Sequence, residues 1–199
     1  MGIGVPYESA GRVQQKARTR AAMIEAARTL MAAGADPTIE EVAAAAGISR
    51  TTAYRYFKNR KDLLVAAYPK VERVTLLPYP APTDVRDRLD LVMTEFMGVV
   101  TGWEPQLRAA LRLSLDPSHA RSGALRQGRA IGWIAEALTP LTPTHPHIDQ
   151  HELAIAIRAA TGIESYVWLV DVAGVTSEQA TQRLRSTAQA VLEQALQTR

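Results

Sequence analysis

Apolar residues recur at intervals of three and four along most of this chain, which is the spacing of one face of an α-helix. The first such stripe lies within residues 17–33 and ends at Gly34. Two short helices are predicted next, over residues 39–46 and 50–57. A fourth helix is predicted to begin at Lys61. No long run alternates with period two, so the pattern predicts an all-α fold without strands.

The two short helices carry recognisable start and stop signals. Thr38 and Glu41 have the spacing of a capping box, in which each side chain accepts a hydrogen bond from the other residue's backbone N–H. Gly47 can adopt the left-handed conformation that ends a helix, and Ser49 is a favourable N-cap for the next one. The small side chains of residues 43–46 allow the second helix to pack closely across the first. These signals predict a helix-turn-helix.

The second short helix has a polar outward face. Ala53 and Phe57 are four residues apart and are expected to face inward. The side chains that are expected to point outward carry guanidinium, hydroxyl and phenol groups: Arg50, Thr51, Thr52, Arg55 and Tyr56. Such groups suit base edges and phosphates in a DNA major groove. The alternative is an ordinary helical hairpin with a solvated face, which would not require this set on one exposed turn.

The rest of the chain is also predicted to be helical. Three prolines within residues 78–82 mark a break. Helices are expected after it, with a further break at residues 116–118 and a loop at 139–147: 83–102, 104–115, about 125–138, 149–172 and 176–197. The segment 149–172 is apolar over most of its circumference, so it must be covered on several sides. One of those covers is predicted to be a second copy of the chain.

Charge is distributed unevenly. The net charge is +3, but residues 1–70 carry 11 Lys and Arg against 6 Asp and Glu, and residues 71–199 carry 12 against 14. All four lysines lie in the first part, which is the footprint expected if only that end contacts a polyanion. The chain has no Cys, no apolar run of membrane-spanning length and no signal-peptide core, so a soluble cytoplasmic protein is predicted.

The second part concentrates large apolar side chains. A ligand pocket and a plain core are equally consistent with this set: Met93, Phe96, Met97, Trp103, Trp133, Tyr166 and Trp168. No nucleophile elbow or glycine-rich phosphate loop is present, so no enzyme and no cofactor are predicted. The four histidines have no suitable partners, and no metal site is expected.

The segment Thr19–Leu64 resembles the DNA-binding region of the TetR family. The matching residues are Arg20, Ile24, Ala26, Ala27, Gly34, Thr38, Val42, Ala43, Ala46 to Ser49, Tyr54, Phe57 and Leu63; Met31, Ala53 and Arg60 depart from the pattern. The resemblance implies phosphate contacts by Thr38, Ser49, Tyr54, Tyr56 and Arg60, and base contacts by Arg50, Thr51, Thr52 and Arg55. Lys61, at the start of the next helix, is a further phosphate candidate. The family's four-helix dimer contact would here use Leu153, Ile157, Leu184, Ala188, Val191 and Ala195.

These expectations give three parts: a flexible basic arm (1–15), a helix-turn-helix domain (16–65) and a helical regulatory and dimerisation domain (66–199). The expected function is a homodimeric regulator, by resemblance a repressor, that leaves double-stranded operator DNA when a small apolar or aromatic effector binds. The helix from Lys61 is expected to link the domains by placing Val71 and Val74 against the second core. The alternative function is an architectural DNA-binding protein without a ligand.

Overall fold

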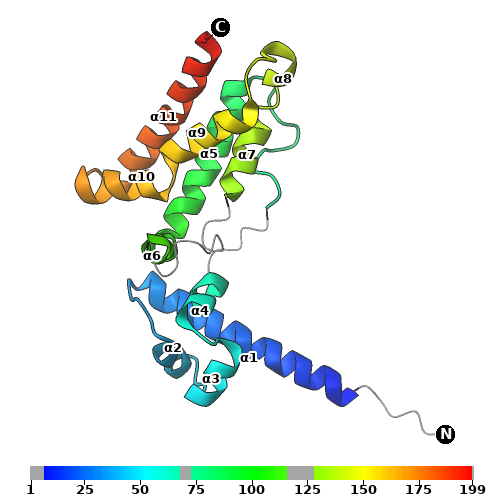
Figure 1. The fold of residues 1–199 in the computed structure, drawn as a ribbon, viewed down its shortest axis with the longest axis vertical. Coiled ribbons are helices and arrows are strands. Elements are labelled where there is room, and N and C mark those ends of the chain that lie inside the picture. The colour runs from blue at the N-terminus through cyan, green and yellow to red at the C-terminus, as the bar shows by residue number, and fades with distance from the viewer. Residues whose placement is uncertain (1–6, 68–72, 116–127, 199) are drawn as a thin grey trace, which may run out of the picture.

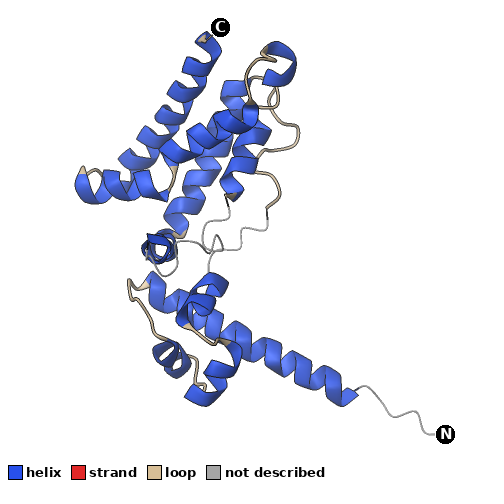
Figure 2. Ribbon diagram, in the orientation of Figure 1, coloured by secondary structure: helices blue, strands red, loops and turns tan. Residues whose placement is uncertain are grey.

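The computed structural model describes residues 7–67, 73–115 and 128–198, and these ranges contain helices and no strand (Figures 1 and 2). The all-α prediction is therefore confirmed. The helices are α1 (Tyr7–Ala32), α2 (Ile39–Ala45), α3 (Arg50–Tyr56), α4 (Arg60–Ala67), α5 (Val85–Gly102), α6 (Glu104–Leu115), α7 (Arg129–Ala137), α8 (Leu141–Thr144), α9 (Gln150–Thr161), α10 (Ile163–Val167), the π-helical segment η1 (Trp168–Val172) and α11 (Ser177–Gln197).

Helices α1 to α4 enclose one small core. It is built from the apolar stripe of α1 and the inward residues of the three following helices: Met23, Ala27, Met31, Ile39, Val42, Ala43, Ala53, Phe57, Leu63, Leu64 and Ala67. Ala109 of α6 also belongs to this core. Of the four small side chains predicted to allow close packing of α3 on α2, Ala43 is buried in this core and Ala46 packs against it, whereas Ala44 and Ala45 are exposed.

Helices α5, α7, α9 and α11 pack on one another around a second, larger core (Figure 1). The segment Gln150–Val172 has a mean hydropathy of 1.4 in its most apolar window, a value that a membrane span could also have. Here it contributes Leu153, Ala154 and Ile157 to the core and packs against α7 and α11, so its apolar character is accounted for by packing within the bundle.

Helix α6 connects the two cores. Its Leu107 belongs to the larger core, whereas its Ala109 belongs to the smaller one. Val74 was expected to lie on the helix that begins at Lys61 and to pack against the second core. This prediction is wrong, because Val74 is 93% exposed and not helical. The described part of α4 ends at Ala67, two residues before a proline that disfavours helix. Val71 lies outside the described residues.

Other boundaries differ from prediction for local reasons. The flexible arm predicted for 1–15 is wrong from Tyr7 onward, because α1 begins there; residues 1–6 lie outside the described ranges. A polar sequence without an apolar stripe can still continue a helix that is anchored further along. The helix expected from residue 83 begins instead at Val85, where Asp84 caps α5 by accepting from the N–H groups of Arg86 and Asp87.

Gly162 interrupts the helix expected over 149–172. It separates α9 from α10 and is followed by the π-helical turn of η1. The predicted loop at 139–147 contains the short helix α8. The helix predicted from about 125 begins at Arg129, and residues 116–127 lie outside the described part of the chain.

Candidate nucleic-acid interface

The turn between α2 and α3 is fixed by the capping groups that the sequence predicted. The Thr38 backbone N–H donates to the Glu41 carboxylate at 2.7 Å, and the Glu41 N–H donates to the Thr38 hydroxyl at 3.2 Å. The first of these hydrogen bonds is the main reason that the pKa of Glu41 lies below its ordinary value. Gly47 has a φ of 67°, and the Ser49 hydroxyl accepts from the Thr52 N–H. The geometry of a helix-turn-helix is therefore set by local interactions.

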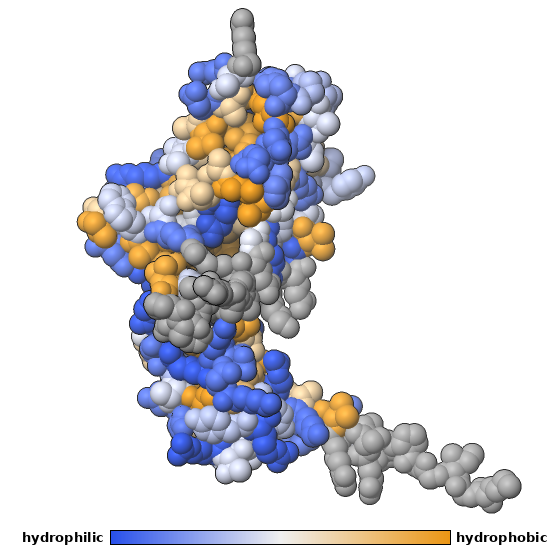
Figure 3. All heavy atoms as spheres, in the orientation of Figure 1, coloured by the Kyte–Doolittle hydropathy of each residue, from blue (hydrophilic) through white to orange (hydrophobic). Residues whose placement is uncertain are grey.

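Helix α3 presents the polar face that was predicted. Ala53 and Phe57 are buried in the small core. Arg50, Thr51, Tyr54 and Arg55 are exposed, and Thr52 and Tyr56 are half-buried. Thr38 and Ser49, at the starts of α2 and α3, are exposed too. Figure 3 shows that the visible face of this part of the molecule is mainly hydrophilic. The structure thus gathers most of the candidate DNA contacts around one exposed helix.

Glu40 is a member of this surface that sequence reasoning missed. It lies on α2, yet its carboxylate oxygen Oε1 accepts from the Tyr54 hydroxyl at 2.8 Å and lies 3.0 Å from Nη2 of Arg50. The Tyr54 hydrogen bond is the main cause that lowers the pKa of Glu40, and the same bond raises the pKa of Tyr54. The sequence gives only one signal for this role, namely a carboxylate on α2, the helix that packs against α3. Carboxylates are too common on helices for this signal to identify Glu40.

Arg60 is placed differently from its expected phosphate contact. Its Nε donates to the carbonyl of Pro37 at 2.9 Å, and its Nη2 forms an ion pair with Asp36. Asp36 also lies 3.4 Å from Nη2 of Arg112 on α6. Arg60 therefore braces the loop before α2, whereas the neighbouring Lys61 is half-buried at the start of α4.

The expected effector residues are mostly core residues. Met93, Phe96, Met97, Trp133 and Tyr166 are buried in the larger core, and the Phe96 and Trp133 rings are 6.4 Å apart. Trp103 is half-buried and packs under the guanidinium of Arg28. Trp168, the first residue of η1, is 57% exposed, so it does not join the group.

The expected dimer residues are also used within the chain. Leu153, Ile157, Leu184 and Ala188 are buried in the larger core, and Val191 and Ala195 pack against it. The four buried residues were expected to contact a second copy of the chain, and their burial within one chain corrects this expectation. The apolar stripes of α9 and α11 face each other and α5. The apolar residues that α9 and η1 expose are different ones: Ile155, Ala156, Ala159, Trp168 and Val172.

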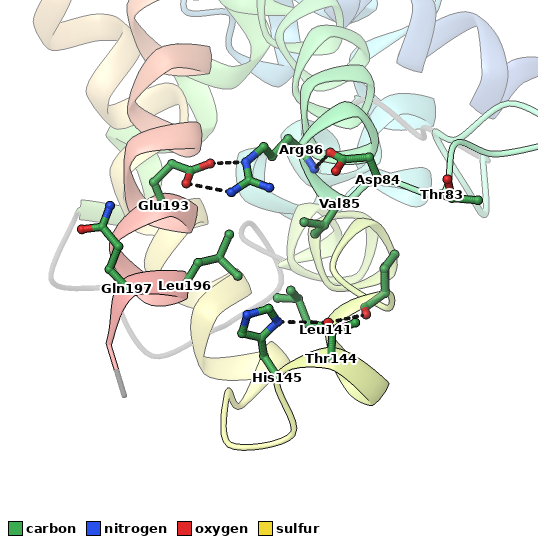
Figure 4. A pocket seen from close by; sticks show the side chains of 11 residues that line it. Thr83, Asp84, Val85, Arg86, Leu141, Thr144, His145, Glu193, Leu196 and Gln197 are labelled. Carbon is green, nitrogen blue, oxygen red and sulfur yellow. Dashed lines mark hydrogen bonds and ion pairs between the residues drawn. The ribbon is translucent and has the colours of Figure 1, made fainter.

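A cavity of about 450 Å³ opens between the start of α5, helix α8 and the end of α11 (Figure 4). Its rim includes Arg86, whose Nη2 donates to Glu193 at 2.9 Å, and His145, whose Nδ1 lies 3.0 Å from the Thr144 hydroxyl. Leu141 and Leu196 supply apolar lining. No sequence motif marked this cavity, since its walls come from three distant segments.

Comparisons with known proteins agree with the N-terminal geometry. Residues 23–67 match the family model described as bacterial regulatory proteins, tetR family. No curated protein matches the chain. Among solved structures, the fold is similar to one described as a TetR-family transcriptional regulator from Rhodococcus sp., with 20% sequence identity and a TM-score of 0.55, over 87% of this chain and 98% of that one. Residues 23–67 are therefore similar to the DNA-binding region of tetR-family regulators, and the overall fold is similar to that of one such regulator.

Proposed function

We propose that this protein is a homodimeric repressor that binds a palindromic operator through α3 and leaves it when a small apolar or aromatic molecule binds the helical domain formed by α5 to α11. The observation that carries the proposal is the exposed polar face of α3, held at a fixed angle by capped, closely packed helices.

The DNA contacts are assigned from position and chemistry. Arg50, at the first position of α3, is the candidate for bidentate recognition of guanine, because its side chain is 74% exposed. Thr51, Thr52 and Arg55 follow on the same helix as further base-edge candidates. The phosphate candidates flank them: Thr38, Ser49, Tyr56 and Lys61. Arg60 acts indirectly, since its guanidinium is engaged by Asp36 and Pro37.

Two-fold association would deliver two copies of α3 to one DNA face. The exposed side of α9 carries Ile155, Ala156 and Ala159, whose small or apolar side chains allow another helix to approach closely. Hydrophobic atoms also reach the visible surface of the C-terminal half in Figure 3. We assign the dimer contact to this outward face. The two operator half-sites would then lie about 34–36 Å, or a multiple of that distance, apart.

Effector coupling is proposed to travel through α6. This helix lies between the two cores and contacts α1, α4, α5 and α10. Its first two turns are tied to the C-terminal segments, because Glu104 accepts from Tyr166 at 2.8 Å and Arg108 pairs with Asp171 of η1. A ligand that fills space near Phe96 and Trp133 would displace neighbouring helices and, through α6, the orientation of the DNA-binding domain. Only a difference in ligand affinity between the two orientations produces a response.

The proposal is tested by binding-site selection from random DNA duplexes with the full-length protein. An enriched palindrome with a defined half-site spacing is expected. Binding to all duplexes without enrichment would support instead a ligand-independent architectural protein, the alternative considered from the sequence.

A further inference from the structure

Two side chains of α3 share one partner on α2. Oε1 of Glu40 accepts the hydroxyl hydrogen of Tyr54 and lies within ion-pair distance of Nη2 of Arg50. The Arg50 guanidinium also lies over the Tyr54 ring, 5.8 Å from its centroid. The three side chains therefore form a closed triangle on the face that is assigned to DNA.

This triangle leaves most of Arg50 available. A guanidinium has five N–H donors, and the one ion-pair contact to Glu40 uses a single nitrogen. The remaining donors include a pair that can meet O6 and N7 of guanine, and the side chain is largely exposed. Arg50 can therefore contact a base while it stays on Glu40.

Tyr54 has no such spare donor. A phenol carries one O–H hydrogen, and here it goes to Glu40. A phosphate oxygen accepts hydrogen bonds but donates none, so Tyr54 cannot bind a phosphate without giving up Glu40. Its position favours a different role from the phosphate contact that resemblance implied, namely holding the carboxylate and the guanidinium together.

We propose that Glu40 is a specificity-determining residue that, together with Tyr54, positions Arg50 for base recognition and disfavours its use on phosphates. The inference rests on the proposed function. In a specific complex, Arg50 keeps its carboxylate partner while it contacts guanine. In a non-specific complex, an Arg50 that turns away from the base edges toward a phosphate gives up Glu40, and the carboxylate is then left without this partner beside a polyanion. Glu40 consequently widens the difference between the two binding modes.

The test is the ratio of specific to non-specific affinity, measured with the full-length protein on a selected operator and on a scrambled duplex. Glu40→Gln is expected to raise non-specific affinity and to lower the ratio roughly 3- to 10-fold, the range expected for losing one partly exposed charged contact. Glu40→Asp keeps the charge but shortens the reach, so it should also lower the ratio. Thermal unfolding of each variant establishes that it is folded.

Two controls separate positioning from charge. Glu25→Gln on α1 makes the same change in net charge at an exposed carboxylate, which forms an ion pair with Arg28. This variant should raise the specific and the non-specific affinity alike and leave their ratio unchanged. In an Arg50→Ala background, Glu40→Gln should no longer affect the ratio. If Glu40→Gln behaves like Glu25→Gln, or its effect persists without Arg50, the inference is overturned while the proposed function stands. If the parent protein has no preferred sequence, both are overturned.

Discussion

The side-chain amide of Gln106 on α6 donates a 3.1 Å hydrogen bond to the backbone carbonyl of Arg28 on α1. Gln106 is only 5% exposed, and among the described residues its Oε1 is a buried polar atom without a hydrogen-bond partner. Three residues earlier in the chain, the Trp103 ring lies 5.5 Å from the Arg28 guanidinium. Arg28 is thus one point at which helices α1 to α4 contact α6, beside Ala109 in the smaller core and the Arg112–Asp36 ion pair.

Replacing Gln106 by Ala should loosen this contact. Loss of the hydrogen bond is expected to reduce the free energy of unfolding by about 0.5–1.5 kcal/mol, partly offset because the unpaired oxygen is also removed. The more specific effect is a smaller change in operator affinity when the effector is added. Gln182→Ala on the exposed side of α11 is the matched control. Unchanged effector response in Gln106→Ala would show that α6 does not transmit the signal through this contact.

Acid should destabilise the protein partly through the capping box. The folded-state pKa of Glu41 lies below its ordinary value of 4.5, mainly because of the hydrogen bond from the Thr38 N–H. A lowered folded-state pKa gives stability that is present above pH 4.5 and is lost as the pH falls through the folded-state value. Glu41→Gln keeps an oxygen for Thr38 but cannot titrate. Denaturant unfolding over a pH series should therefore show a smaller acid-induced loss for Glu41→Gln than for the parent; equal losses would contradict the assignment.

The dimer contact can be tested by comparing a residue on the exposed face of α9 with a residue on the buried face of α11. Ile155→Arg places a charge on the outward face and is expected to give a folded monomer, because Ile155 is 36% exposed and not part of the core. Leu184→Arg should instead unfold the domain, since Leu184 is 2% exposed inside the chain. Mass measurement at micromolar concentration, together with circular dichroism, separates these results. A folded monomer in the parent protein would rule out the proposed dimer.

Effector binding should weaken operator affinity by the same factor by which operator binding weakens effector affinity. A typical coupling free energy of about 1–3 kcal/mol corresponds to a roughly 5- to 150-fold weaker operator affinity with effector bound, and the same factor must apply to effector affinity when operator is present. Tryptophan fluorescence can follow binding near Trp133, whose Nε1 donates to the Arg73 carbonyl at 3.2 Å.

Two variants locate the effector. Trp133→Ala should abolish the response if the ligand enters the core beside Phe96. Leu196→Arg should abolish it if the ligand instead occupies the cavity between α5, α8 and α11, where Leu196 forms part of the wall. A ligand that binds equally well with and without operator is not an effector of this protein.

The features that could be predicted from the sequence are those encoded locally. The caps at Thr38 and Ser49 and the turn at Gly47 depend on residues within a few positions of one another, and each was found in its expected place. The start of α6 at Glu104 also matched its prediction.

The features that the sequence did not reveal depend on tertiary packing. A helical stripe at Leu184 indicates a buried face, but it does not distinguish burial within the chain from burial against a second copy. The sharing of Glu40 by Arg50 and Tyr54 depends on the angle between α2 and α3, and the bracing of Arg60 by Asp36 joins residues 24 positions apart. Gly162 interrupts an apolar run whose periodicity alone predicts one continuous helix.

The most direct test of sequence-specific DNA recognition by α3 compares the parent and Arg50→Ala on the selected operator and on operators changed at each base pair. If Arg50 contacts guanine, the variant should lose about 1–3 kcal/mol of binding free energy on the operator and should no longer distinguish substitutions at one symmetric pair of positions. Discrimination at all other positions should be retained. Binding by Arg50→Ala with the parent's affinity and base preference at every position would contradict the account.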